Sequence, residues 1–350
     1  MNNEIKAKYN AFWKHDFDER AVLNIEVPSP ASHTEYPENT ADRWENTTWR
    51  KEAFSRYMNN TKYLAEGFPH YWINLGPGAL AAMLGCEYTY FPYTVWFGKN
   101  PMIKEWSDMD KVKLLPENPM NKLILDMTKE FCKTSKDSYV VCITDLGGVM
   151  DILDSFRGTE QLMYDMVDEP DKVLSAIEKI DNFWEEAFTQ SYKILEKANK
   201  CMSAWIPIWC SKRWYPLQCD FSAMISPDDF KKFVMPSLVR SANFLDHSIY
   251  HLDGMGELPH VDMLLSIDRL DGIQWVPGAG KPALADDQWF PLYEKIQAKG
   301  KCLVLFGVDS PSDCLYLLKN LSHKGLFISS CFKSEEEAQE VIRKAKEYAK

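Results

Sequence analysis

The stretch SIYHLDGMGELPHVDMLL, residues 248–265, joins a short apolar run, a glycine turn and an amphipathic segment. The run at 248–253 is typical of a buried strand, and Gly254 allows the chain to turn sharply after it. His251 and Asp253 stand two residues apart, so an extended strand would direct both side chains to one face. This segment therefore predicts a strand–turn–helix unit with two polar side chains at the end of the strand.

Similar units recur along the chain, because short β-branched or apolar runs alternate with longer amphipathic stretches. The alternation favours a parallel sheet covered by helices. Ser226 followed by Pro227 is a helix start signal, and Gly300 is a helix end signal. The expected strands lie at 21–27, 70–75, 138–145, 201–208, 248–253, 272–276, 302–308 and 326–330. This many strands in 350 residues predict an α/β fold of the closed (β/α)₈ TIM barrel type, and no GxGxxG follows the first strand to suggest a dinucleotide-binding sheet.

Two segments depart from this alternation. Residues 85–106, GCEYTYFPYTVWFGKNPMIKEW, are aromatic and have β character, which predicts a small β insertion at the barrel mouth. Residues 28–69 are polar and rich in capping residues, so residues 1–69 would hold an N-terminal helical extension and the first strand. No Ser/Gly/Pro-rich linker separates two domains, and we expect one barrel domain over 1–350.

The bulk composition excludes some classes of partner. The formal net charge is -11, from 51 acidic and 40 basic residues, which argues against nucleic acid or an anionic membrane surface. The chain has no apolar run long enough for a membrane helix and no apolar signal core. Nine cysteines without a disulfide framework suit a reducing cytoplasm. We expect a cytoplasmic protein and leave a homodimer open.

Three side chains at predicted strand ends could hold a metal ion. In a (β/α)₈ barrel the active site lies where the strands end. Cys331, in the stretch LFISSCF at 326–332, follows the last strand, as His251 and Asp253 follow the fifth. An imidazole, a carboxylate and a thiolate would bind zinc and leave one coordination position open. Glu257 is the substitute ligand if Asp253 is not one, and the alternative is a buried cysteine with a strand-capping histidine.

Other polar residues at the expected strand ends are candidates for catalysis. Asp145 and Asp220 each follow a predicted strand or an apolar run, where a carboxylate could bind substrate or act as a general acid or base. Gln274 lies on the sixth expected strand and could orient a substrate. The alternative for Asp145 is a helix N-cap.

Aromatic residues predict the walls of the site. The chain has 12 Trp, and several stand near expected strand ends, where they could enclose a methylated ammonium or a methoxyarene. The alternative is that each tryptophan belongs to the core. The residues expected to bind substrate are Asn74, Trp209, Trp214, Tyr215 and Trp275.

Four stretches resemble the uroporphyrinogen decarboxylase superfamily. They are ITDLGGVMDILDSFRGTEQLMYDMVDEPDKVLSAIEKI (143–180), CDFSAMISPDDFKKFVMPSLVR (219–240), HLDGMGELPHVDMLL (251–265) and IQWVPGAGKP (273–282). The likeness covers roughly 135–348. It implies a (β/α)₈ barrel, and the superfamily includes both decarboxylases and corrinoid-dependent methyltransferases.

The resemblance also separates those two activities. The decarboxylases need no metal and carry an Arg-rich signature of the form RQAGRY, which this chain lacks. One methyltransferase branch carries His-x-Cys at a strand end and a later Cys, all on zinc. Here the pair reads His251-Leu252-Asp253 and the later cysteine matches Cys331. Replacing a thiolate by a carboxylate makes the metal more Lewis-acidic, which suits polarising a leaving group.

The resemblance thus implies a zinc-dependent methyltransferase. It would move a methyl group between a small methylated substrate, of the methoxy or methylamine type, and cobalamin carried by a separate corrinoid protein. Two alternatives remain. One is a metal-free decarboxylase of the uroporphyrinogen decarboxylase type, and the other is a non-catalytic barrel that binds a small ligand.

Overall fold

The computed structural model describes residues 1–16, 19–136 and 138–349 and shows a mixed α/β protein. Its largest sheet has seven strands in the order β2-β1-β11-β10-β9-β8-β7. All neighbours in it run parallel except β2, which is antiparallel to β1. The strands are β1 (Val22–Pro28), β2 (Thr61–Ala65), β7 (Trp214–Gln218), β8 (His247–Asp253), β9 (Gly272–Val276), β10 (Cys302–Phe306) and β11 (Leu326–Cys331).

Two smaller sheets complete the strands of the described residues. β3 (His70–Trp72) pairs in parallel with β6 (Val140–Cys142), and β4 (Tyr88–Tyr90) pairs with β5 (Val95–Phe97) as an antiparallel hairpin. The described residues form no ladder from β1 to β3 or from β6 to β7. The expected α/β class with parallel strands is confirmed, while closure into a (β/α)₈ barrel stays a prediction.

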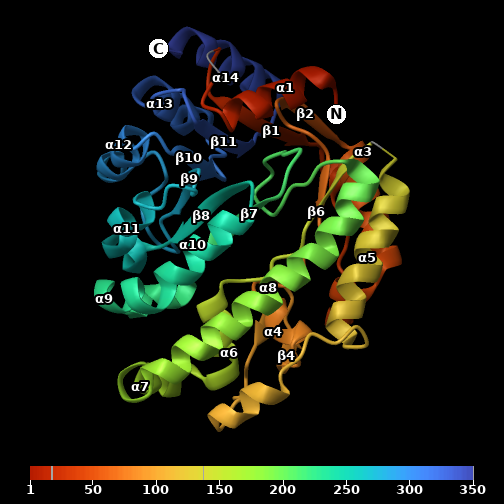
Figure 1. Ribbon diagram of the computed structural model, residues 1–350. Coiled ribbons are helices and arrows are strands. Elements are labelled where there is room, and N and C mark those ends of the chain that lie inside the picture. The colour runs from red at the N-terminus through yellow and green to blue at the C-terminus, as the bar shows by residue number, and fades with distance from the viewer. Residues whose placement is uncertain (17–18, 137, 350) are drawn as a thin grey trace.

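Fourteen α-helices lie between and outside these strands in the described part of the chain (Figure 1). Helices α10 to α14 flank the large sheet, and the long helix α8 packs against α5 and α6. They are α1 (Asn3–Phe12), α2 (Thr40–Glu45), α3 (Thr47–Asn59), α4 (Leu80–Met83), α5 (Pro119–Ser135), α6 (Val149–Arg157), α7 (Thr159–Asp168), α8 (Pro170–Asn199), α9 (Pro227–Asp229), α10 (Met235–Phe244), α11 (Val261–Leu265), α12 (Phe290–Ala298), α13 (Pro311–Asn320) and α14 (Glu335–Tyr348). None of these helices is long and apolar enough to cross a membrane.

The local signals in the sequence explain several element ends. The Ser226 hydroxyl accepts a hydrogen bond from the backbone N–H of Asp229, so Ser226 caps α9 with Pro227 at its first position. Gly300, with φ of 67°, follows the end of α12. Capping chemistry was therefore a dependable guide to where these helices begin and end.

One expected strand was wrong. Residues 201–208 form no strand and contribute only a single bridge between Met202 and Cys210. The strand at this place in the order is β7, whose sequence WYPLQ lay outside the expected strands. Pro216 hides the strand signal, because proline cannot donate to a ladder. It is tolerated here since β7 is the edge strand of its sheet.

The two segments that broke the alternation fold as helices and a hairpin. Residues 28–69 include α2, α3 and β2, so a helical extension is present. The hairpin of β4 and β5 lies within 85–106. It lines a hollow together with residues that follow β6 and β7, which places it beside the ends of these strands.

Candidate metal and substrate site

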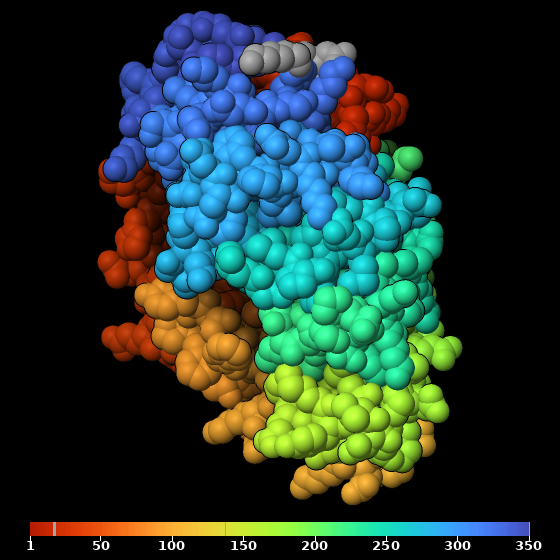
Figure 2. Space-filling view, turned by 90° about the vertical axis from the view of Figure 1, so that its left-hand side faces the viewer, coloured from red at the N-terminus to blue at the C-terminus, as the bar shows by residue number. Residues whose placement is uncertain are grey.

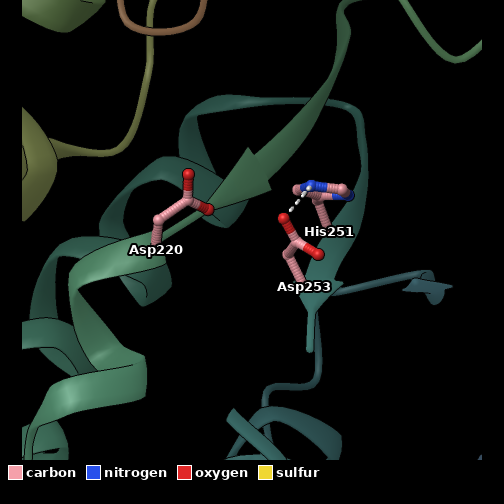
Figure 3. Close-up of side chains that lie close together, drawn as sticks. All are labelled: Asp220, His251 and Asp253. Carbon is pink, nitrogen blue, oxygen red and sulfur yellow. Dashed lines mark ion pairs between the residues drawn. The ribbon is translucent and has the colours of Figure 1, made fainter. Parts of the chain in front are cut away.

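His251, Asp253 and Asp220 meet at the carboxyl ends of two neighbouring strands (Figure 3). His251 and Asp253 are on β8, and Asp220 begins the turn of 3₁₀-helix that follows β7. One ligand atom from each lies within 4.8 Å of the others, and His251 Nε2 is 3.9 Å from Asp253 Oδ2. Gly254, with φ of 88°, turns the chain away directly after Asp253. The strand–turn unit therefore presents two adjacent donors, as its sequence predicted, and the neighbouring strand adds a third.

A hydrogen bond to Gln274 fixes the orientation of the His251 ring. Gln274, on β9, pairs with His251 in the sheet register, and its Oε1 lies 2.8 Å from His251 Nδ1. An amide oxygen can only accept, so Nδ1 carries the proton, and in the neutral ring the lone pair is on Nε2. That lone pair faces Asp253. This is the tautomer that a metal-binding histidine needs, and a partner on the other ring nitrogen is typical of such sites.

Trp205 covers the His251 ring edge-on. The two ring centroids are 4.7 Å apart and the rings are inclined at 85°. Trp205 lies in the irregular segment between α8 and β7 that sequence reasoning took for a strand. Trp205 was one of the tryptophans expected near strand ends, but it was not among the residues chosen to bind substrate, because no local pattern shows that this segment folds over the strand ends.

Asp145 is buried beside this cluster and is tied to β7. Its Oδ1 accepts hydrogen bonds from the Gly147 backbone N–H at 2.8 Å and from the Tyr215 hydroxyl at 3.0 Å. Tyr215 in turn accepts from the Leu146 N–H at 2.6 Å. Burial raises the pKa of Asp145 to about 6, although both donors oppose the rise. A buried carboxyl with such a pKa suits proton exchange near neutral pH.

Asp151 is a second acidic group that the sequence did not single out. Its Oδ1 accepts from the Phe221 backbone N–H at 2.8 Å, and its Oδ2 is buried without a donor. Burial, followed by the charge of Asp220, raises the pKa of Asp151 to about 8. Asp151 and Asp220 line a hollow of about 250 Å³ under the hairpin residue Trp96. The sequence held no periodic signal for Asp151, because it lies inside α6.

Glu257 supports the turn after β8. It is fully buried, its Oε2 accepts from the Tyr250 hydroxyl at 2.9 Å, and its Oε1 accepts from the Asp253 N–H at 3.3 Å. Burial raises the pKa of Glu257 to about 9. In the described residues, the side chains close enough together to share a metal ion are Asp220, His251 and Asp253, and Glu257 is not among them. Its contacts are those of a residue that positions Asp253.

Cys331 lies at the end of β11 in a different hollow. It is exposed, and its backbone N–H donates to Asp309 Oδ1 at 2.7 Å. Burial of the sulfur and the charges of Asp309 and Glu26 raise the pKa of the Cys331 thiol. The donor group found in the described residues holds Asp220, His251 and Asp253 and does not include Cys331. A zinc ligand role for Cys331 thus stays a prediction, and the structure adds Asp220 as a candidate ligand.

The residues expected to bind substrate lie in three different places. Trp214 pairs with His247, the first residue of β8, so it lies at the opposite strand end from the cluster. Trp209 is near it, since its backbone oxygen accepts from Trp13, which packs on Trp214. Both were expected at the mouth, and the error follows from the misplaced strand at 201–208.

Trp275 and Asn74 also have structural contacts. Trp275 is fully buried on β9 with its ring 5.1 Å from that of Trp289, on the face opposite to Gln274. This is the core role that was the alternative for each tryptophan. The Asn74 side-chain oxygen Oδ1 accepts a hydrogen bond from the Gly76 N–H at 2.9 Å. Asn74 also lines a hollow together with Arg50 and Tyr57. Of the five residues, Tyr215 is the one that is hydrogen-bonded to a candidate catalytic carboxylate, that of Asp145.

Two hollows that contain residues of the cluster are lined by acidic side chains. Figure 2 shows the surface hollowed between the orange segment with the hairpin and the cyan and blue segments that follow β8 to β10. One hollow of about 490 Å³ contains Asp253, Asp309 and Asp313, and the hollow under the hairpin contains Asp151 and Asp220. Neither lining includes a lysine or an arginine. Such a surface favours a cation and disfavours a substrate with many carboxylates.

Comparison with known proteins supports the fold. No family model and no curated protein sequence matches this chain. The structure is similar to that of a methyltransferase from Methanosarcina mazei, with a TM-score of 0.59 and 11% sequence identity over 98% of this chain and 98% of that one. The matched region therefore spans nearly the whole of both chains. At this identity it shows a shared fold.

Proposed function

We propose that this protein is a metal-dependent methyltransferase that moves a methyl group between a small methylated substrate and a separate corrinoid protein. The observation that carries the proposal is the His251 imidazole, whose Nδ1–H is held by Gln274 while Nε2 faces two carboxylates. The fold shared with a methyltransferase supports it. We place the reaction at the mouth of a closed (β/α)₈ barrel in a cytoplasmic protein, and cobalamin would come with the partner.

The donor set fits a divalent metal ion. His251, Asp253 and Asp220 offer one imidazole nitrogen and two carboxylate oxygens, which catalytic zinc sites accept and which leave room for a further ligand. The ion would act as a Lewis acid on the atom that loses the methyl group. Asp145 would hold or release a proton near that atom, and Trp205 would keep water from the His251 side. Gln274 would keep the imidazole in its binding tautomer.

The first test is the metal content of the purified protein. We expect about one zinc per chain, by elemental analysis, without added metal, and a loss of affinity in His251→Ala and Asp220→Asn. His247→Gln is the matched control, since it changes an imidazole at the other end of the same strand. Cys331→Ala separates the two ligand sets, because it removes the metal only if the sequence-based set is correct. A wild-type protein that binds no divalent metal would refute the proposal.

The second test is methyl transfer itself. The chain is mixed with a reduced corrinoid protein and methylated compounds, and methylation of the cobalt is followed by absorbance. Transfer that disappears in His251→Ala supports the proposal. A chain that binds such compounds and leaves them unchanged would point to the non-catalytic barrel, and release of carbon dioxide from a carboxylated substrate without metal would point to the decarboxylase.

A further inference from the structure

A separate hollow of about 200 Å³ is lined by residues of β1, the first residue of β3 and the last residues of β11. Its lining includes Asn24, Glu26, His70, Asp309, Ser329 and Cys331. Gly307 and Asp309 also line the larger hollow that contains Asp253, so the two spaces share a wall. A ligand held here would therefore lie next to the proposed metal site.

Glu26 gives this hollow a carboxylate that protein groups only partly satisfy. Its Oε2 accepts from the Tyr57 hydroxyl at 2.6 Å. Its Oε1 lies 3.7 Å from His70 Nδ1, which is too far for a hydrogen bond. His70 Nδ1 is 3.0 Å from the Phe68 carbonyl oxygen, so the proton on Nδ1 is directed there and not at Glu26. Glu26 thus brings a carboxylate acceptor to the hollow.

Asn24 provides an independent sign of a missing donor. The residue is 1% exposed, and its Nδ2 donates to Ser329 Oγ at 3.0 Å. Its Oδ1 is buried and has no donor. Buried amide oxygens are almost always paired, because an unpaired one loses its hydration without compensation. A ligand with N–H groups would supply the missing hydrogen bond.

The charge of the hollow selects the ligand class. Its lining includes Glu26 and Asp309 but no lysine or arginine. The donor atoms here do not form a metal-binding group, since the group found in the described residues lies at Asp220, His251 and Asp253. A compact organic cation that donates hydrogen bonds fits these features better than a metal ion or a neutral ether.

We propose that this hollow binds the protonated nitrogen of a small methylated amine, with Glu26 and Asn24 as its acceptors. This inference names the substrate class of the proposed function, and it depends on that function for the transfer of the methyl group. In the transfer, the bond from the methyl carbon to nitrogen breaks and nitrogen keeps the electron pair. The protonated amine then leaves as a neutral amine, and the reduced cobalt of the partner supplies the pair for the new bond. Because the protonated nitrogen has no lone pair to give a metal ion, its protonation would take the place of the Lewis acid for this substrate, and no further proton is required.

A binding experiment on the full chain tests this inference without turnover. Dissociation constants of methylammonium, methanol and tetramethylammonium are measured by ligand-observed NMR titration. We expect methylammonium to bind about tenfold or more tighter than methanol, because its hydrogen bonds are charge-assisted. It should also bind more tightly than tetramethylammonium, which has the charge but no N–H. Methanol binding as tightly as methylammonium would overturn the inference, and tetramethylammonium binding as tightly would overturn the role of the N–H groups.

Variants locate the binding in this hollow. Glu26→Gln keeps an acceptor for Tyr57 but removes the charge, and it should weaken methylammonium binding about tenfold or more. Asn24→Asp adds a carboxylate of nearly the same shape and should tighten it, which keeps the test open if the first variant does not fold. Asp313→Asn removes a carboxylate from the neighbouring hollow alone and should leave the affinity unchanged.

The outcomes separate this inference from the proposed function. Unchanged affinity in a folded Glu26→Gln protein would overturn the inference, whatever the metal content. Methyl transfer from methanol with no methylammonium binding would overturn it while supporting the proposed function. Methylammonium binding that depends on Glu26 in a chain without metal or transfer would support the inference and refute the proposed function.

Discussion

The two sides of the strand array are built differently. From β7 through β11 to β1 the strands form one continuous parallel ladder, and it carries His251, Asp253 and Gln274. On the other side β3 and β6 pair only with each other in the described residues, and the segment from 201 to 213 contributes a single bridge. The continuous side fixes donors by backbone register. On the interrupted side the irregular segment 201–213 takes the place of a strand. Asp145 on that side must therefore be held by contacts other than strand pairing.

Side chains join the two sides where the ladder is absent. Tyr215 on β7 donates to Asp145 and accepts from the Leu146 N–H, both directly after β6. Trp184 of α8 donates to the Gly147 carbonyl oxygen at 3.1 Å. Gly147 packs closely on Gly78: a Cβ atom on Gly147 would lie 2.5 Å from the Cα of Gly78. Buried side-chain hydrogen bonds can therefore position a site where strand pairing is missing.

The largest expected effect comes from breaking this side-chain junction. Tyr215→Phe removes a donor from buried Asp145 and leaves the Leu146 N–H unpaired, so we expect a loss of about 3 kcal/mol in unfolding free energy. Tyr293→Phe, beside the continuous ladder, removes one hydrogen bond to Leu284 and should cost about 1 kcal/mol. Urea denaturation measures both, and equal losses would remove the distinction between the two sides.

The next effect tests the continuous side. Gln274→Leu frees the His251 ring, and we expect metal affinity to fall about 10- to 100-fold. Gln274→Glu is the control, because a carboxylate oxygen still accepts from Nδ1–H. The affinities follow from competition with a chromogenic chelator. If Gln274→Leu bound metal as tightly as the wild type, the hydrogen bond would have no part in the site.

A third prediction concerns α8, the helix packed beside the interrupted side. Burial raises the pKa of Asp181 to about 6, with the Ser237 hydroxyl opposing the rise. The folded state therefore holds this proton more tightly than the unfolded state, and its stability falls as pH rises from about 4 to 6. Between pH 5 and 7 the wild type should lose about 1 kcal/mol relative to Asp181→Asn. Urea denaturation at the two pH values checks this, and parallel curves would contradict it.

The smallest expected effect lies in the hairpin. The Trp96 side chain is 66% exposed, so Trp96→Ala should change stability by no more than about 0.5 kcal/mol. Val95, beside it, is buried, and Val95→Ala should cost about 2 kcal/mol. Thermal unfolding compares the two variants. A large loss of stability in Trp96→Ala would contradict this, and would show that the hairpin belongs to the stable core in the same way as the parallel sheet.

Local patterns predicted the continuous side well. The runs at 248–253, 272–276 and 326–330 became β8, β9 and β11, because unbroken apolar runs flanked by helix signals are typical of parallel strands. The same patterns failed at 201–218. The segment 201–208, which contains Trp205, resembled a strand and folded irregularly, while Pro216 concealed a true strand at the sheet edge.

The sequence by itself determined that His251 and Asp253 share one face at a strand end, since side-chain direction alternates along any extended chain. It also placed the helix caps and the glycine turn. Only the tertiary structure decided that Asp220 joins these two, that Cys331 lies in another hollow beside Glu26, and that Asp145 is held by Tyr215. Those contacts depend on strand order and on how a loop folds over it. Neither is encoded in the spacing of residues along one element.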